Sequence, residues 1–244
     1  MEETVNPWVT FDCNTLAAKQ GLVIGIDEAG RGALAGPVTA AALCLSRQFY
    51  RSEACRQYID ESQCKDSKQL SIQRRETLLS RLNALHEQGS LAFAHGMASV
   101  EEIEKFNILG ATRIAMVRAL DQLALTVNEV FALSLNSTKR LSNKKSIPVL
   151  LIDGRPLKPF PYTHRGVVQG DKKSLAIAAA SIVAKMTRDQ TLIELDKQYP
   201  QYGFAQHKGY GTATHRRAIL KHGASPIHRT RFLRKLNPDK QNRL

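Results

Sequence analysis

Short apolar runs separated by longer polar stretches recur along the chain, a pattern that indicates strands alternating with helices. Residues 22–26 are apolar and rich in β-branched side chains, and residues 37–45 predict a second strand that returns beside the first after a glycine-rich turn. Residues 91–97, 147–152 and 165–169 predict three more strands. The chain is therefore expected to form a sheet of five strands.

Helical patterns occupy three stretches between these strands: residues 71–85, 99–124 and 174–198. Ser99 and Glu102 form a capping box at the start of the second stretch, because each side chain can bond the other residue's backbone amide. A break in that helix is expected near Gly110. The segment after Pro200 is expected to be helical and peripheral.

This order of elements predicts an α/β fold, a mixed five-stranded sheet flanked by helices with a C-terminal helical extension. With 244 residues, of which 43% are hydrophobic, the chain can bury one sizeable core. We expect a single domain over residues 21–236, with its helical C-terminal region at about residues 200–236. Residues 1–20 are expected to be a tail or a covering segment, and residues 237–244 a second tail.

Composition narrows the choice of partner. A formal net charge of +13 gives the surface a positive field that suits a polyanion, nucleic acid first and an acidic membrane second. No apolar run approaches the roughly 18 residues of a membrane span, and Glu2 and Glu3 do not fit a signal peptide, so a cytoplasmic protein is expected. The four cysteines lack zinc-like or C-x-x-C spacing and are expected to be reduced thiols without a role.

Acidic residues stand where apolar runs end. Asp27 and Glu28 follow the first strand, Asp153 follows the fourth, and Asp171 precedes the last long helix. Carboxylates gathered at strand ends repel one another unless a cation lies between them, and hard oxygen ligands favour Mg²⁺ or Mn²⁺. In a basic chain such a cluster predicts two-metal hydrolysis of a phosphodiester. Each acid alone is more often a turn or cap residue, so the prediction depends on all four.

The first two acids pose a geometric problem. Because Asp27 and Glu28 are adjacent, a regular strand directs their side chains to opposite faces. Both can bind one metal site only if the strand bends there, and the glycines from Gly30 onward permit such a bend.

A glycine loop follows these acids directly. Gly30, Arg31 and Gly32 can bring backbone amides and one positive charge close to a ribose or a phosphate. The alternative is an ordinary hairpin turn with an exposed arginine, which is the simpler interpretation of this motif alone.

The C-terminal region adds polar candidates. Tyr210, which is flanked by glycines, can stack on a base or hydrogen-bond a 2′-hydroxyl, or merely cap a loop. Ten lysines and arginines occur from Lys208 onward, with His215, His222 and His228 among them. This composition favours a surface that follows phosphates over a merely solvated basic helix.

Three further charged residues carry weaker signals. Lys68 precedes the helix at residue 71 and is a secondary candidate for contact with a phosphate. Asp189 and Glu194 lie inside the long helical stretch at phases typical of a solvated face, so both are left out of the site.

Taken together, these motifs resemble the signature of ribonuclease HII, a type 2 ribonuclease H. The match begins with residues 25–32 (GIDEAGRG) and 34–38 (LAGPV). Later blocks follow in the family's order: residues 66–70 (DSKQL), 107–112 (NILGAT), 152–154 (IDG), 170–171 (GD), 179–185 (AASIVAK), 202–204 (YGF) and 207–210 (HKGY). The resemblance covers about residues 22–232.

The resemblance implies an RNase H-like fold and four metal ligands: Asp27, Glu28, Asp153 and Asp171. It also implies four residues that recognise the ribose 2′-hydroxyl at an RNA-to-DNA junction: Gly30, Arg31, Gly32 and Tyr210. The implied substrates are RNA/DNA hybrids and duplex DNA that contains ribonucleotides, cut on the 5′ side of the ribonucleotide to leave a 3′-hydroxyl. Such an enzyme serves ribonucleotide removal and RNA primer processing, and we expect a monomer without an obligate protein partner.

The chain departs from the family pattern at two positions. Ala33 stands where proline is usual, and Gly211 follows Tyr210 where proline is common, so both changes are expected to loosen the loops without removing a ligand. The related ribonuclease HIII carries an additional N-terminal domain, whereas 26 residues precede Asp27 here, which favours type HII.

Two other functions compete with this prediction. A nucleic-acid-binding protein of the same fold without catalysis is disfavoured by the presence of all four acids. Another two-metal nuclease, acting on branched DNA, is disfavoured by the glycine loop and Tyr210, which serve recognition of a 2′-hydroxyl.

Overall fold

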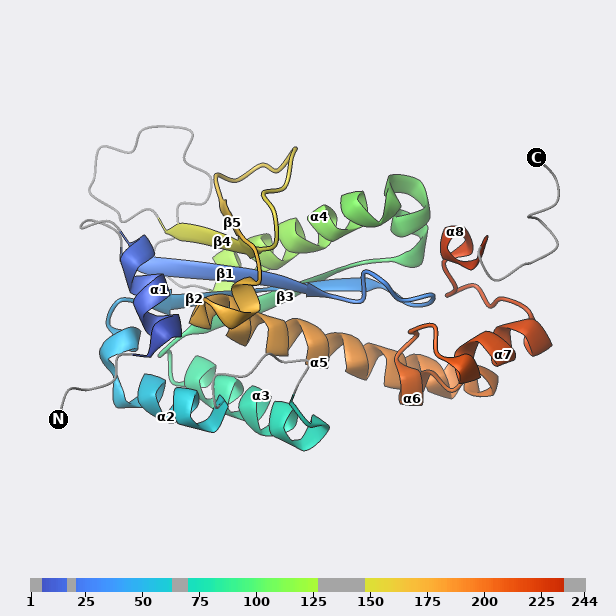
Figure 1. Cartoon of the computed structure of the whole chain (residues 1–244), viewed down its shortest axis with the longest axis horizontal. Coiled ribbons are helices and arrows are strands. Elements are labelled where there is room, and N and C mark those ends of the chain that lie inside the picture. Colours follow the sequence, from blue (N-terminus) through green and yellow to red (C-terminus); the bar gives the residue numbers. More distant parts are fainter. Residues whose placement is uncertain (1–5, 17–20, 63–69, 127–147, 235–244) are drawn as a thin grey trace.

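A mixed five-stranded sheet with helices on both faces forms the centre of the protein (Figure 1). The computed structural model describes residues 6–16, 21–62, 70–126 and 148–234. The strands are β1 (Leu22–Ala29), β2 (Val38–Ser46), β3 (Ala92–Ala98), β4 (Val149–Asp153) and β5 (Arg165–Val167). Their order in the sheet is β3-β2-β1-β4-β5, with β1 antiparallel to β2 and parallel to β4. The predicted sheet is therefore confirmed.

The helices cover both faces of this sheet. In chain order they are α1 (Pro7–Thr15), α2 (Glu53–Ser62), α3 (Ile72–Glu87), α4 (Val100–Thr126), α5 (Leu175–Gln198), α6 (Phe204–His207), α7 (Ala213–His222) and α8 (Thr230–Leu233), with short 3-10 turns η1 (Phe49–Arg51), η3 (Gly170–Lys172) and η4 (Pro200–Tyr202). Helix α4 packs on one face, and α5, with α1, α2 and α3 outside it, packs on the other. The sequence did not indicate α2.

Helix α5 lies unusually close to β1. A Cβ placed on Gly25 would overlap the backbone of Ala176, so only glycine permits this approach. The small residues at the start of α5 are buried, and each removes bulk from the contact. These small residues and Gly25 together permit the close packing of α5 against the sheet.

Helix α4 begins at the predicted capping box. The Ser99 amide donates to Oε2 of Glu102 at 3.0 Å, and the Glu102 amide donates to the Ser99 hydroxyl at 3.2 Å. The predicted break lies at Asn107 (φ 58°, ψ 173°), three residues before Gly110. The Asn107 side chain then accepts from the amides of Leu109 and Gly110, so it caps the helix that restarts there.

Helix α1 is tied to the start of α5. The indole of Trp8 donates to the carbonyl of Lys172 at 2.8 Å. Asp12 is fully buried, and its Oδ2 accepts from the Tyr50 hydroxyl at 2.9 Å and from the Ala176 amide at 3.0 Å. Burial raises the pKa of Asp12 to about 6. Helix α1 therefore covers the N-terminal end of α5.

The segment after Pro200 is helical in short pieces, as predicted, but it is not peripheral. It reaches back to the loop that follows β1, where the Leu34 amide donates to the Gly209 carbonyl and the Gly36 amide donates to the Ile227 carbonyl, both at 2.8 Å. The expectation of a peripheral segment was wrong because helical periodicity does not show which distant loop will cover a helix. Among the described helices, none combines the length and apolar character needed to cross a membrane.

Candidate active site

Two of the predicted acids meet at the ends of neighbouring parallel strands. The register of β1 with β4 pairs Ile26 with Ile152, so Asp27 and Asp153 follow side by side. Side-chain alternation along the strands directs both toward the face covered by α5. Asp27 is buried, with 6% of its surface exposed.

A third acid joins them through a short turn. The Gly170 amide donates to Oδ1 of Asp153 at 2.6 Å, which holds η3 against the end of β4. Asp171, the next residue of η3, is buried. The structure therefore brings Asp27, Asp153 and Asp171 to one end of the sheet from three separate elements.

Glu28 takes the opposite face. Strand β1 stays paired with β2 as far as Ala29 opposite Thr39, and the chain turns only at Gly30, whose φ is 92°. The bend expected at Asp27 and Glu28 was therefore wrong, because strand pairing continues through both residues. The Glu28 carboxylate instead accepts from Nη1 of Arg31 at 3.0 Å.

The four predicted carboxylates are suitable metal ligands in their chemistry, but their side chains do not converge. Within the described ranges, no three Asp, Glu, His or Cys side chains converge on one point. Asp27 Oδ1 instead accepts from the Glu28 amide at 2.7 Å, as Asp153 does from Gly170. Four hard oxygen donors at one end of a sheet fit a divalent cation such as Mg²⁺ or Mn²⁺ in donor chemistry. Binding would have to draw the side chains together against their mutual repulsion.

A cavity of about 450 Å³ opens beside the acids on the α4 side of the sheet. Its lining includes Glu28, Asp153 and four cationic side chains: Arg31, Arg113, Arg155 and Lys158. Arginine and lysine groups next to carboxylates suit a phosphate held close to a metal site. Arg113, Arg155 and Lys158 could not be predicted from the sequence, since they become neighbours only when α4 meets the segment after β4.

The two glycines of the predicted loop differ in their surroundings. A Cβ on Gly30 would overlap Nε of Arg188, whereas a Cβ on Gly32 would meet no atom within 4 Å. Arg31 between them leaves 48% of its side chain exposed. The amide of Ala33 donates to the Gly30 carbonyl at 3.3 Å, a turn bond that a proline there could not make.

Tyr210 lies next to the glycine loop. It is half-buried, and its ring centroid lies 5.3 Å from Cζ of Arg188 and 5.7 Å from Nζ of Lys185. The ammonium group of Lys208 is turned onto the Ala205 carbonyl of its own helix, so it does not extend toward the acids. Lys68 lies outside the described residues, and its phosphate contact stays a prediction.

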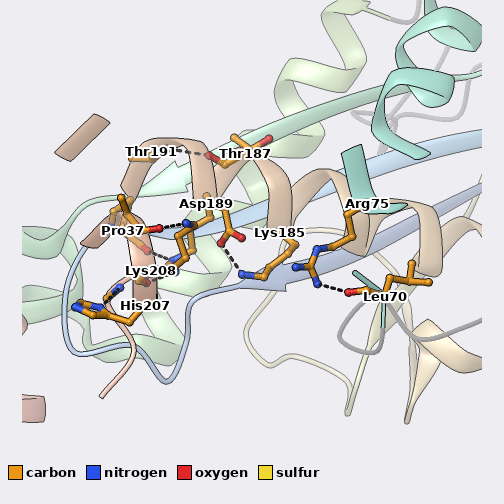
Figure 2. Close-up of polar contacts among 12 residues, drawn as sticks. Pro37, Leu70, Arg75, Lys185, Thr187, Asp189, Thr191, His207 and Lys208 are labelled. Carbon is orange, nitrogen blue, oxygen red and sulfur yellow. Dashed lines mark hydrogen bonds and ion pairs between the residues drawn. The ribbon is translucent and has the colours of Figure 1, made fainter. Parts of the chain in front are cut away.

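The prediction of a solvated face at Asp189 was wrong. Asp189 is 9% exposed and accepts a bond from Lys185 on the same helix (Figure 2). Helices α3 and α6 both pack on α5, and such tertiary contacts are not visible in the helical phase of a residue. Burial lowers the pKa of Lys185, although its pairing with Asp189 opposes that shift. Glu194 is exposed, as expected.

The C-terminal region is only in part a basic surface. Arg216, Arg217 and Lys221 are exposed, which agrees with the prediction. His215 and His228 are buried instead, with their Nε2 atoms 3.1 Å apart, and burial lowers the pKa of each to about 4. Basic composition alone did not separate residues of the surface from those of this inner cluster.

A mixed α/β sheet with acids at the ends of its central parallel strands, beside a cation-lined cavity, defines an RNase H-like protein. The sequence of residues 24–235 matches the family model described as Ribonuclease HII. The chain belongs to the ribonuclease HII family, and it is a type 2 ribonuclease H, a hydrolase.

Relatives and solved structures agree with this assignment. The chain is 41% identical over 211 residues to the Ribonuclease HII of Coxiella burnetii, covering 86% of this chain and 88% of that protein. Its fold is similar to the ribonuclease H2 of Pyrococcus horikoshii OT3 (TM-score 0.58, 23% identity, 88% and 96% of the two chains). It is also similar to Bst-RNase HIII in complex with Mn²⁺ (TM-score 0.54, 15% identity, 91% and 69% of the two chains).

Proposed function

We propose that this enzyme hydrolyses the RNA strand of RNA/DNA hybrids and cuts on the 5′ side of ribonucleotides embedded in duplex DNA, leaving a 3′-hydroxyl. Its cellular role would be ribonucleotide removal and RNA primer processing. The observation that carries this proposal is the side-by-side placement of Asp27 and Asp153, with the turn that carries Asp171 bonded to Asp153 through Gly170, in a member of the ribonuclease HII family.

Asp27, Glu28, Asp153 and Asp171 would hold the divalent metal. Carboxylates are the ligands that Mg²⁺ and Mn²⁺ prefer, and the Mn²⁺ complex of Bst-RNase HIII supports the second of these ions. A bound pair of such ions supplies Lewis acidity at the phosphate and a water of lowered pKa. The Glu28 carboxylate already has Arg31 beside it, so the same arginine is placed to contact a phosphate once Glu28 turns to a metal.

The chain's other residues would hold the nucleic acid. Arg113, Arg155 and Lys158 on the cavity wall would bind backbone phosphates, which supply most of the affinity for a duplex. The open space at Gly32 leaves room for a ribose against the backbone, and Tyr210 would donate to its 2′-hydroxyl. We propose that the enzyme works as a monomer in the cytoplasm without an obligate protein partner.

The first test compares three duplexes: one DNA duplex with a single ribonucleotide, one RNA/DNA hybrid and one all-DNA duplex. With Mg²⁺ or Mn²⁺ the enzyme is expected to cut the first two and to spare the third. Asp153→Asn is expected to lower the rate by about 1000-fold or more, because it removes a charged metal ligand. Gel separation of end-labelled products measures both the rate and the position of the cut.

A matched control uses Asp60→Asn on α2, an exposed acid remote from the strand ends, which should cut like the wild type. Absence of cleavage of both ribonucleotide-containing duplexes with either metal would overturn the proposal. Cleavage of the all-DNA duplex at a similar rate would instead support a nuclease for branched or ordinary DNA.

Tyr210→Phe tests recognition of the ribose. Loss of the phenol is expected to lower kcat/KM for the single-ribonucleotide duplex by about tenfold, because one hydrogen bond to the 2′-hydroxyl is lost. Binding of the same duplex, measured by fluorescence anisotropy with Ca²⁺ in place of the active metal, should change less than about threefold because phosphate contacts persist. An equal loss of binding and cleavage would contradict this role.

A further inference from the structure

Two arginines beside the glycine loop are buried completely. Arg188 of α5 and Arg229 at the start of α8 are the two largest fully buried side chains among the described residues. Neither takes part in an ion pair there, so their charges are stabilised mainly by hydrogen bonds. Burial lowers the pKa of Arg229 to about 9, and the charge of Arg188 adds to that effect, which leaves the group protonated at neutral pH.

Arg188 joins the glycine loop to the segment that carries Tyr210. Its Nε donates to the Pro37 carbonyl at 3.0 Å and its Nη2 to the Ala35 carbonyl at 3.0 Å. Its Nη1 donates to the Lys208 carbonyl at 2.9 Å, and its guanidinium also lies against the Tyr210 ring. Pro37 and Lys208, from opposite ends of the chain, lie together beside α5 as a result (Figure 2).

Arg229 holds both ends of the same loop. Its Nη1 donates to the carbonyls of Gly30 at 2.7 Å and Arg31 at 3.1 Å. Its Nε donates to Gly36 at 2.9 Å, and its Nη2 to Pro37 at 3.0 Å. Arg188 and Arg229 therefore make six contacts to carbonyls of residues 30–37 and a seventh to Lys208, which ties the loop to the Tyr210 segment.

Only arginine can make this set of contacts. Its planar fork carries five N–H donors in fixed directions, whereas a lysine ammonium donates from one point and cannot reach carbonyls on two segments. The loop is also shaped around the guanidinium, since a Cβ on Gly30 would overlap Arg188. Both side chains are too deeply buried to touch a nucleic acid, so any effect on catalysis must pass through the loop or the Tyr210 segment.

We propose that Arg188 and Arg229 are positioning residues that set the glycine loop against Tyr210 and so determine how well the enzyme selects a ribonucleotide. This inference rests on the proposed function, because it requires the glycine loop and the Tyr210 segment to contact the same ribose. Loss of either guanidinium should allow the two segments to move independently, while the cavity cations outside the loop, Arg113, Arg155 and Lys158, stay in place.

The test compares Arg188→Lys and Arg229→Lys with Arg118→Lys on α4. Arg118 is a suitable control because it also bonds a carbonyl, that of Met97, and a carboxylate, that of Glu102, but does not contact the loop. On the single-ribonucleotide duplex we expect kcat to fall by about 10- to 100-fold in the first two variants, since small misplacement near a reacting centre has effects of that size. KM should stay within about threefold, and Arg118→Lys should match the wild type.

Amide hydrogen exchange measures how firmly the loop is held and does not depend on catalysis. Exchange at residues 30–36 and 208–210 should become at least about tenfold faster in both variants, while β1 and β4 stay protected. Unchanged exchange in these segments would overturn the proposal. A fall in kcat and in thermal stability together with a rise in KM would also overturn it, because a purely structural role predicts that combination. If Arg229→Lys does not fold, Arg188→Lys decides the matter, because it leaves the contacts of Arg229 in place.

The two proposals can fail separately. If the wild-type enzyme does not cut the single-ribonucleotide duplex, the proposed function is wrong, and the exchange comparison still shows whether the arginines hold the two segments together. If the wild type cuts but the variants keep both full kcat and full selectivity over the all-DNA duplex, the positioning role is wrong and the proposed function stands.

Discussion

At the scale of single residues, Gly30 and Gly32 are glycines for different reasons. Gly30 has a φ of 92° and packs against Arg188, so the fold itself requires it. Gly32 is exposed and has open space where a Cβ would lie, so nothing in the fold demands a glycine there. The proposed function assigns this open space to the ribose of the substrate.

Alanine at each position should therefore have opposite consequences. Gly30→Ala is expected to lower the free energy of unfolding by about 1–3 kcal/mol, because it adds backbone strain and a clash. Gly32→Ala should leave stability unchanged or raise it by up to about 1 kcal/mol, yet lower kcat/KM on the single-ribonucleotide duplex by about tenfold. Urea unfolding and cleavage rates measure both, and wild-type cleavage by Gly32→Ala would contradict a substrate at that position.

The meeting of Asp27 and Asp153 could be predicted from the sequence, whereas the contacts of the two buried arginines could not. Asp27 and Asp153 each end an apolar run, so their meeting follows once the two strands pair in parallel. The opposite face of Glu28 also follows from strand alternation, although the bend expected to correct it does not occur. Arg188 and Arg229 had no comparable signal, because their partners are backbone carbonyls between 20 and 199 residues away in the chain.

At the scale of elements, the C-terminal extension is a support for the glycine loop. His215 and His228 form its inner cluster, where the Nδ1 of His215 contacts the carbonyl of Tyr210 at 2.9 Å. Local signals located elements well where partners are close in sequence, as the capping box of Ser99 and Glu102 shows. They did not show that the segment carrying α6, α7 and α8 would pack against a loop near the other end of the chain.

Acid should weaken this extension. The pKa of His215 and His228 in the folded state is about 4, below the usual 6.5, so the unfolded chain binds more protons between these values. Stability is therefore complete above about pH 6.5 and is lost as the pH falls toward 4. Urea unfolding at pH 7.5 and pH 4.5 should show a smaller loss in His215→Gln than in the wild type.

The exposed His222 provides the control for this measurement, and His222→Gln should keep the wild-type dependence on pH. Asp12, whose pKa is raised to about 6, favours the folded state as the pH falls and so opposes the histidines. Asp12 is present in the wild type and in both histidine variants, so its contribution cancels in the comparison. An equal loss in His215→Gln and the wild type would show that the cluster does not titrate with unfolding.

At the scale of the whole molecule, only some of the cationic residues behind the net charge of +13 are placed to contact a nucleic acid. Arg188 and Arg229 are buried, so their charges cannot touch a phosphate, whereas Arg155 and Lys158 are exposed on the cavity wall. Affinity for a duplex should therefore depend on a small set of cations near the acids rather than on the total charge.

Salt titration separates these groups. The logarithm of the duplex affinity should fall linearly with the logarithm of salt concentration, and Arg155→Ala should reduce the magnitude of that slope by about 1. Arg56→Ala on α2, at an exposed position paired with Glu53, should leave the slope unchanged. Equal slopes for both variants would place the duplex away from this cavity.

The contacts that hold the glycine loop also fix the order in which the enzyme can be completed during translation. Gly30 leaves the ribosome early, but its partner Arg229 is synthesised 199 residues later. All five strands, which end at Val167, precede Arg229 in the chain. A nascent chain can thus complete the sheet that carries its acids before Arg229 has been synthesised, so we expect the proposed selection of ribose to form later than the sheet.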